Sequence, residues 1–342
     1  MDEKLHFADF SKELLDWYAV SARELPWRAG PAARAQGFRP DPYRVWMAEI
    51  MLQQTTVPHA TRYFLAFTER WPTVEALAAA DDADVMGAWA GLGYYARARN
   101  LLKCAREVAE LGTWPDTVDG LRALPGIGPY TAGAIAALAF GRRAAAVDGN
   151  VDRVFARLLA LKGAWKAEKA HLKSVVEALV PEDRPAEFAE GLMDLGATIC
   201  TPKSPNCLIC PVCGFCLART EGAPERYPMK PKKRPKPKRL GHVYVLVGPD
   251  RTVLTETRPD RGLLGGMMGL PTSNWSGELG SPEFPSKGNW EEIGEVRHVF
   301  THFGLTLKVW RARADNRAQT TPIQTAVDHL PSVFAKALKL AL

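Results

Sequence analysis

The sequence predicts two domains of different fold class, a mostly α N-terminal domain (residues 1–225) and an α+β C-terminal domain (residues 241–342). Apolar residues recur at helical spacing through the first 225 residues, whereas strand-like runs begin only after residue 241. Between them, residues 226–240 contain eight Lys or Arg, several prolines and no acidic residue. This composition is typical of an extended, solvated linker. At 342 residues, the chain is long enough for two domains.

The composition is typical of a soluble globular protein. The 46% hydrophobic content supports full cores, and no apolar run reaches membrane length. The start, Met1-Asp2-Glu3-Lys4, has no signal-peptide pattern, so we expect a soluble intracellular protein. The formal net charge of +6 indicates a polyanionic partner, but residues 226–240 carry that excess and residues 1–225 are acidic overall. Phosphate contacts in the first domain must therefore come from local clusters and backbone amides.

The helices of the first domain are predicted from the spacing of their apolar residues, and no strand is expected there. The expected helices cover residues 8–22, 43–57, 59–70, 74–80, 130–140, 151–161, 172–180 and 188–199.

The first domain is organised around the stretch LPGIGPYTAGAIAALAFGRRAAAVDGNVD, residues 124–152. Pro125 ends one helix, Gly126 and Gly128 can adopt positive φ in a tight hairpin, and Pro129 suits the first turn of the next helix. Backbone N–H groups beside a helix N-terminus bind phosphate without reading sequence. A simple turn between two helices would also explain the pattern. The following helix is nearly all small residues, so we expect it to be buried on all sides.

Two carboxylates are candidates for catalysis. Glu49 lies among apolar residues in the segment AEIMLQQT. It is either a surface glutamate or a half-buried one, whose raised pKa would suit a general acid. Asp148 directly precedes the helix 151–161. It is an N-cap, a carboxylate that stabilises a developing cation, or both.

The segment GLGYYARARN, residues 91–100, interleaves aromatic and cationic side chains at the start of a helix. One interpretation is a wedge that enters a base stack while arginines hold phosphates. The other is a turn that packs tyrosines into the core and leaves the arginines solvated.

Five cysteines, Cys200, Cys207, Cys210, Cys213 and Cys216, fall within residues 200–216 and indicate metal binding rather than disulfides. The last four form three successive C-x2-C steps. Without Cys213, the spacing is C-x6-C-x2-C-x5-C. An iron–sulfur cluster and structural zinc are both compatible with four thiolates.

In the C-terminal domain we expect a strand pair at 242–247 and 252–257, and two more strands at 295–303 and 305–311. Phe300-Thr301-His302 should form a loop tip that carries a ring, a hydroxyl and an imidazole. The alternative is a strand end with Phe300 in the core.

Together, LPWR, AEIMLQQT, GLGYYARARN, LPGIGPYTAGAI, VDGNVDR, the cysteine order and Phe-Thr-His resemble the adenine DNA glycosylases of the MutY type, which belong to the helix-hairpin-helix, endonuclease III superfamily. The resemblance implies a helix-hairpin-helix glycosylase domain with a [4Fe–4S] cluster in the loop 200–216. Its ligands would be Cys200, Cys207, Cys210 and Cys216. The C-terminal domain resembles a Nudix fold that serves lesion recognition, without the glutamate box of the hydrolases.

The resemblance also implies a reaction: excision of adenine paired with 8-oxoguanine or guanine in double-stranded DNA, after the base is flipped out. Glu49 would protonate adenine N7, Asp148 would stabilise the sugar cation, and Tyr130 and Asn150 would assist. Relatives that cleave the strand have a Schiff-base lysine where this chain has Tyr130, so a monofunctional enzyme is expected. We expect a monomer, in the cytoplasm at the nucleoid, with no membrane partner.

The remaining positions implied by the resemblance contact DNA. Trp27, Arg28, Leu52 and Glu190 would line the adenine pocket, and Gln54, Thr55, Leu92 and Tyr94 would surround the lesion pair. Arg97, Gly126 and Gly128 would hold phosphates, and Phe300, Thr301 and His302 would read the lesion, with Thr301 where the family usually has serine. Three alternatives stay open: a non-catalytic Fe–S DNA-binding module, a mismatch glycosylase for thymine or uracil, and a nucleotide-pool hydrolase.

Overall fold

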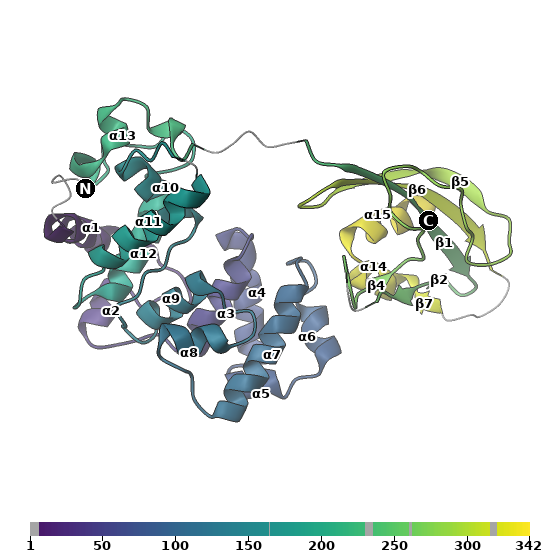
Figure 1. Cartoon of the computed structure of the whole chain (residues 1–342). Coiled ribbons are helices and arrows are strands. Elements are labelled where there is room, and N and C mark those ends of the chain that lie inside the picture. Colours follow the sequence, from purple (N-terminus) through teal and green to yellow (C-terminus); the bar gives the residue numbers. More distant parts are fainter. Residues whose placement is uncertain (1–6, 164, 230–234, 260–261, 315–319) are drawn as a thin grey trace. The chain divides into compact units, whose positions relative to one another are not determined.

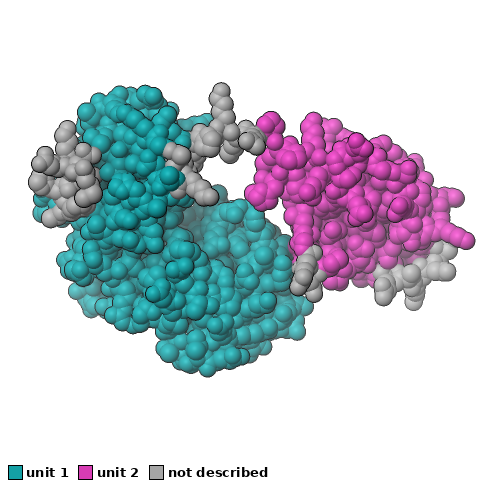
Figure 2. Space-filling view, in the orientation of Figure 1, with its two compact units in different colours: residues 1–231 teal, residues 232–342 magenta. Residues whose placement is uncertain are grey.

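The computed structural model describes residues 7–163, 165–229, 235–259, 262–314 and 320–342. The chain divides into two compact units, unit 1 (Met1–Pro231) and unit 2 (Lys232–Leu342), shown in Figures 1 and 2. The division falls inside the segment 226–240 that was expected to be a linker. Among the described residues, no helix is long and apolar enough to span a bilayer.

Unit 1 is helical, and its described residues form no strand, which confirms the predicted fold class. Two short 3-10 turns, Cys213–Phe215 and Pro224–Arg226, accompany the α-helices. The α-helices are α1 (Phe7–Ser21), α2 (Pro31–Ala35), α3 (Pro42–Leu52), α4 (Val57–Arg70), α5 (Val74–Ala78), α6 (Asp82–Ala88), α7 (Ala96–Leu111), α8 (Val118–Ala123), α9 (Pro129–Leu138), α10 (Gly149–Leu158), α11 (Trp165–Leu179), α12 (Pro185–Thr198) and α13 (Leu217–Thr220).

Two apolar cores lie within unit 1. One is built mainly by the contiguous helices α3 to α9, and the other by α1 together with α10, α11 and α12. Helix α9 packs against α3 and α12, and every residue from Thr131 to Leu138 is buried. Gly133 lets the segment before α10 approach α9 closely, because a Cβ at Gly133 would lie 2.2 Å from the Ala145 carbonyl oxygen. The predicted all-buried helix is confirmed.

The helix expected over 43–57 is wrong at its end, because α3 stops at Leu52 and α4 starts at Val57. Gln54 has a φ of +58°, a left-handed conformation that no helix continues. In the hairpin between α8 and α9, Gly126 has the expected positive φ of +77°, whereas Gly128 has −88°. Only the first glycine therefore needs its conformational freedom.

Unit 2 contains a five-stranded sheet in the order β5-β6-β1-β2-β7 and a two-stranded sheet, β3-β4. Strands β1 and β6 are parallel, and the other pairs are antiparallel. Helices α14 and α15 contribute to the core beneath the large sheet. The elements are β1 (Lys238–Gly248), β2 (Thr252–Leu254), β3 (Glu256–Thr257), β4 (Met268–Gly269), β5 (Glu291–Val299), β6 (Gly304–Arg313), β7 (Thr320–Pro322), α14 (Ile323–His329) and α15 (Ser332–Ala341).

The predicted strands of unit 2 are present, with three differences in extent. Strand β1 begins at Lys238, inside the expected linker, because residues 238–247 pair with β6 along its length. The run 252–257 divides into β2 and β3, which belong to different sheets. Strand β5 begins at Glu291 rather than at residue 295, and it ends at Val299, so residues 300–303 form a loop.

Candidate active site

Glu49 is a buried carboxylate in the last turns of α3, and only 5% of its surface is exposed. It is buried because α3 is covered nearly all round, since every residue from Val45 to Met51 is buried. Burial raises the pKa of Glu49 to about 7. A hydrogen bond with Tyr130 lowers that pKa and the negative charge of Asp148 raises it. The surface interpretation of Glu49 is therefore excluded, and its carboxyl group can carry a proton at neutral pH.

Asp148 is the N-cap of α10. Its Oδ1 accepts hydrogen bonds from the backbone N–H groups of Asn150 (2.8 Å) and Val151 (2.7 Å), and its Oδ2 accepts one from Asn150 Nδ2 (3.0 Å). Burial raises the pKa of Asp148 above its usual value, and these hydrogen bonds offset part of that rise. All three donors stabilise the charged form at a helix N-terminus.

A chain of hydrogen bonds extends from Asp148 towards the cysteines. Arg153 Nη2 donates to Asn150 Oδ1 (3.0 Å), and Arg153 Nε donates to the Cys200 carbonyl oxygen (2.7 Å). Asn150 thus orients Asp148, and Arg153 links Asn150 to the start of the cysteine loop.

Tyr130, in the first turn of α9, completes the group. Burial, and then the charges of Glu49 and Asp148, raise the pKa of Tyr130 well above its usual value, so its hydroxyl is neutral. Helices α3, α9 and α10 therefore bring Glu49, Tyr130 and Asp148 together from positions about a hundred residues apart.

A buried ionic network borders these residues. Arg28 Nη1 donates to both oxygens of Asp194, at 2.8 and 2.9 Å, and Arg28 Nε lies 3.7 Å from Glu190 Oε1. Burial lowers the pKa of Arg28, but Glu190 and Asp194 outweigh it and the net shift is upward. Arg28 and Glu190 also act electrostatically on Glu49. The network is therefore part of the same site.

The other residues expected in the adenine pocket pack against the core. Trp27 is buried edge-to-face against Phe64, with ring centroids 5.2 Å apart. Leu52 is half-buried at the end of α3.

Two loops carry the residues expected at the wedge. Gln54 and Tyr94 are exposed and have φ values of +58° and +50°, and Thr55 is half-buried. Leu92, in contrast, is 5% exposed and belongs to the core. Both Gln54 and Tyr94 therefore lie at loop tips that a duplex can reach.

Arg97 joins these two loops. Its guanidinium donates to the carbonyl oxygens of residues 50, 51 and 53 at the end of α3, and of residues 92 and 93 in the Tyr94 loop, at 2.6–3.3 Å. It also lies 5.3 Å from the Trp89 ring centroid. The Arg97 guanidinium therefore bonds to backbone carbonyls within the protein, whereas the sequence predicted that it contacts a DNA phosphate.

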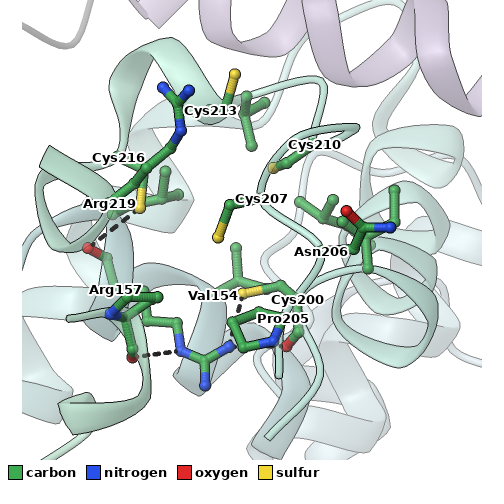
Figure 3. A pocket seen from close by; sticks show the side chains of 15 residues that line it. Val154, Arg157, Cys200, Pro205, Asn206, Cys207, Cys210, Cys213, Cys216 and Arg219 are labelled. Atoms are coloured by element: carbon green, nitrogen blue, oxygen red, sulfur yellow. Dashed lines mark hydrogen bonds between the residues drawn. The ribbon is translucent and has the colours of Figure 1, made fainter. Parts of the chain in front are cut away.

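The five clustered cysteines line one pocket with Arg157. Figure 3 shows the sulfurs of Cys200, Cys207, Cys210 and Cys216 around one space and that of Cys213 directed away from it. Arg157 is 1% exposed, and its Nη1 donates to Cys200 Sγ at 3.2 Å. Its other side-chain hydrogen bonds within the described residues go to backbone carbonyls rather than to carboxylates. A buried cation among thiols fits an anionic metal–thiolate group.

The loop 300–303 lies at the turn between β5 and β6 in unit 2. Thr301 and His302 are exposed, and Phe300 is half-buried against the core. Both interpretations of Phe300-Thr301-His302 are thus partly met, since the tip is solvated while the first ring is packed.

Comparison with known proteins identifies the family. A model described as "HhH-GPD superfamily base excision DNA repair protein" matches residues 47–178, and a NUDIX domain model matches residues 242–340. The adenine DNA glycosylase of Homo sapiens is 33% identical over 92% of this chain and 68% of the human protein. That of Mycolicibacterium smegmatis is 41% identical over 62% of this chain and 70% of its own length. The chain belongs to the adenine DNA glycosylase family.

The fold of this glycosylase also occurs in solved structures of related enzymes. A thermostable thymine-DNA glycosylase is 29% identical, with a TM-score of 0.55, over 63% of this chain and 97% of that structure. An endonuclease III–DNA covalent intermediate has a TM-score of 0.53 at 22% identity, over 65% of this chain and 99% of that structure. The second likeness supports the fold alone.

Several side chains that support the site of the glycosylase were not predicted from the sequence. Tyr18 donates to Glu190 Oε2 at 2.8 Å, Arg34 lies 3.3 Å from Glu190 Oε1, and Asp194 anchors Arg28. One signal was available: two acids spaced i, i+4 in the otherwise apolar segment 188–196. No local signal marks Tyr18, because its partner lies 172 residues away.

Proposed function

We propose that this adenine DNA glycosylase of base excision repair removes adenine paired with 8-oxoguanine or guanine in double-stranded DNA, and that it does so without cleaving the strand. The observation that carries the mechanism is the group formed by buried Glu49 and half-buried Tyr130 and Asp148, in which the pKa of Glu49 is about 7. Two carboxylates with different environments are what acid-assisted glycosidic cleavage needs.

In the proposed reaction the adenine is flipped out of the duplex into the pocket beside Arg28 and Glu190. Protonated Glu49 donates to adenine N7, so that the base leaves as a neutral molecule when the bond from N9 to the sugar C1′ breaks. Asp148 carries the opposite charge beside the cationic sugar. A water molecule then adds to C1′ and loses a proton, which leaves an abasic site.

Tyr130 supports monofunctional chemistry. It occupies the position at which the resemblance implies a lysine in strand-cleaving relatives, and a phenol cannot form a Schiff base with the sugar. Since Tyr130 is neutral and hydrogen-bonded to Glu49, it serves to position the acid.

For the cysteine site we propose a [4Fe–4S] cluster held by Cys200, Cys207, Cys210 and Cys216, with Cys213 free. The direction of the Cys213 side chain and the buried Arg157 support this set. When bound, the cluster would fasten the loop 200–216 by four metal–thiolate bonds. We propose no redox step in base removal.

For unit 2 we propose that Thr301 and His302 read the base opposite the adenine. Oxidation of guanine changes N7 from an acceptor to a donor and adds a carbonyl at C8, so a hydroxyl and an imidazole at an exposed tip can distinguish the two bases. The chain would act as a monomer, since unit 1 alone contains the carboxylate pair, and it would act in the cytoplasm at the nucleoid, where its substrate lies.

The test is the base released in single turnover from duplexes containing adenine opposite 8-oxoguanine, adenine opposite guanine, and thymine opposite guanine. The thymine duplex is included because of the 29% identity to a thymine-DNA glycosylase. We expect adenine release only, with abasic but unbroken strands. Glu49→Gln should lower the rate about 10²–10⁴-fold with little change in DNA binding.

Glu187→Gln is the matched control. Glu187 is another buried glutamate of unit 1. It forms an ion pair with Arg184 and is not one of the two carboxylates of the proposed reaction. Thymine release, or a Glu49→Gln rate close to that of Glu187→Gln, would contradict the proposal.

A further inference from the structure

Residues at and just before the start of β1 contact the loop 300–303 and Gly304, the first residue of β6. Lys236 Nζ donates to the Phe300 carbonyl oxygen at 2.7 Å, and the Pro237 carbonyl accepts the Gly304 N–H at 2.9 Å. The guanidinium of Arg239 lies over the Phe303 ring, 4.3 Å from its centroid. These residues were assigned to the linker by composition, but they belong to the support of the loop.

Aromatic side chains also pack against the loop 300–303. Phe300 stacks on Trp275, with centroids 6.1 Å apart, and its ring meets those of His298 at 4.5 Å and Phe303 at 5.0 Å. The Phe300 N–H closes the turn on the Phe303 carbonyl at 2.9 Å. Both ends of the loop are therefore held, and its two exposed residues, 301 and 302, project from a fixed base.

The two cations act on that base without belonging to the tip. Lys236 fixes the carbonyl directly before Thr301, and Arg239 covers the ring directly after His302. Because backbone position decides whether a hydroxyl and an imidazole can reach the same base, a small shift of either end changes hydrogen-bond geometry at the tip.

We propose that Lys236 and Arg239 are positioning residues that set the preference for the base opposite the adenine. They act through the loop and do not touch the base. The inference rests on the proposed function, in which Thr301 and His302 read that base.

The experiment uses the full chain and one substitution, to methionine, which keeps a long unbranched side chain and removes the charge. The variants are Lys236→Met, Arg239→Met and, as matched control, Lys238→Met. Lys238 is exposed, lies between the other two, and makes no side-chain hydrogen bond, ion pair or ring contact within the described residues. His302→Ala reports on the reading itself. Adenine release is measured at subsaturating enzyme from duplexes with 8-oxoguanine or guanine opposite, and the ratio of the two rates is compared.

We expect Lys236→Met and Arg239→Met each to lower this ratio about two- to fivefold, the range that an exposed cation–π contact or hydrogen bond supports. The rate on the guanine duplex and the thermal midpoint of both variants should match those of Lys238→Met. Loss of a positive charge weakens DNA binding in general and lowers both rates equally, so it does not change their ratio. Arg239→Lys should restore part of the ratio, since it keeps a cation over the ring.

Two results overturn the inference alone: a ratio that falls in His302→Ala but not in the two methionine variants, or an equal fall in Lys238→Met. If His302→Ala itself keeps the full ratio, the loop does not read the base. In that case the lesion-reading part of the proposed function fails, and this inference with it.

Discussion

Glu49 shows how one residue acquires its chemistry from its surroundings. Its desolvation is the largest effect on its pKa, and Asp148 adds a like charge, whereas Tyr130 and Arg28 oppose the shift. Asp148 is half-buried, and the three hydrogen bonds that it accepts at a helix N-terminus offset part of the rise in its pKa. The same side-chain chemistry is thus divided into an acid and a carboxylate.

This division predicts a pH dependence of base excision. The general acid must be protonated, and the pKa of Glu49 is about 7, so its active fraction falls as the pH rises through about 7. In single turnover with saturating enzyme, the rate should decline about tenfold per pH unit above that point. The slow residual rate of Glu49→Gln should not show this decline with rising pH. A rate that stays constant from pH 6 to pH 9 in the unmodified enzyme would remove Glu49 as the acid.

At the scale of elements, the ends of helices place the functional loops. Helix α3 ends at Leu52, where Gln54 turns the chain, and the free carbonyls of its last turn are satisfied by Arg97. The same guanidinium bonds the loop that carries Tyr94. One side chain therefore fixes the distance between the two loop tips expected at the lesion pair.

Arg97→Lys separates this structural part from a phosphate contact. An ammonium group cannot bond five carbonyls in a planar fork, so we expect the free energy of unfolding to fall by roughly 2 kcal/mol. Chemical denaturation of the variant measures the change. Arg122→Lys is the control, because Arg122 is exposed and its ion pair with Asp119 is long, at 4.0 Å. Unchanged stability together with weakened DNA binding would instead support the phosphate role.

At the scale of the whole molecule, the cysteine loop links the end of unit 1 to helix α10. Arg157 of α10 donates to the Thr201 carbonyl near the start of the cysteine loop and to the Pro224 carbonyl beyond its end, and so ties that helix to the last segment of the unit. Metal–thiolate bonds would add to this closure, since a metal site formed only in the folded state stabilises it.

The ligand set gives a prediction at this scale. Purified protein should contain about four irons per chain and be brown. Cys213→Ser should keep the iron and the thermal midpoint, whereas Cys210→Ser should lose both. Metal analysis and absorption spectra of protein isolated without oxygen measure the outcome. One zinc per chain, or loss of iron in Cys213→Ser, would refute the set.

The sequence alone determined the helical and α+β classes, which follow from the local spacing of apolar residues. It also named Glu49, Asp148 and the clustered cysteines as candidates, through their residue types and through the family resemblance. The buried helix α9 was equally predictable, because small residues over ten positions leave no polar face.

Tertiary structure decided how those residues are used. Three features depend on partners tens to hundreds of residues away: the bonds of Arg97 to carbonyls, the bonds of Tyr18 and Asp194 to Glu190 and Arg28, and the support of the loop 300–303 by Lys236. The pKa of Glu49 depends on burial, which packing creates and periodicity only suggests. Hydrogen bonds and desolvation act through space, so spacing along the chain can name a candidate residue, but only the folded chain assigns its partners.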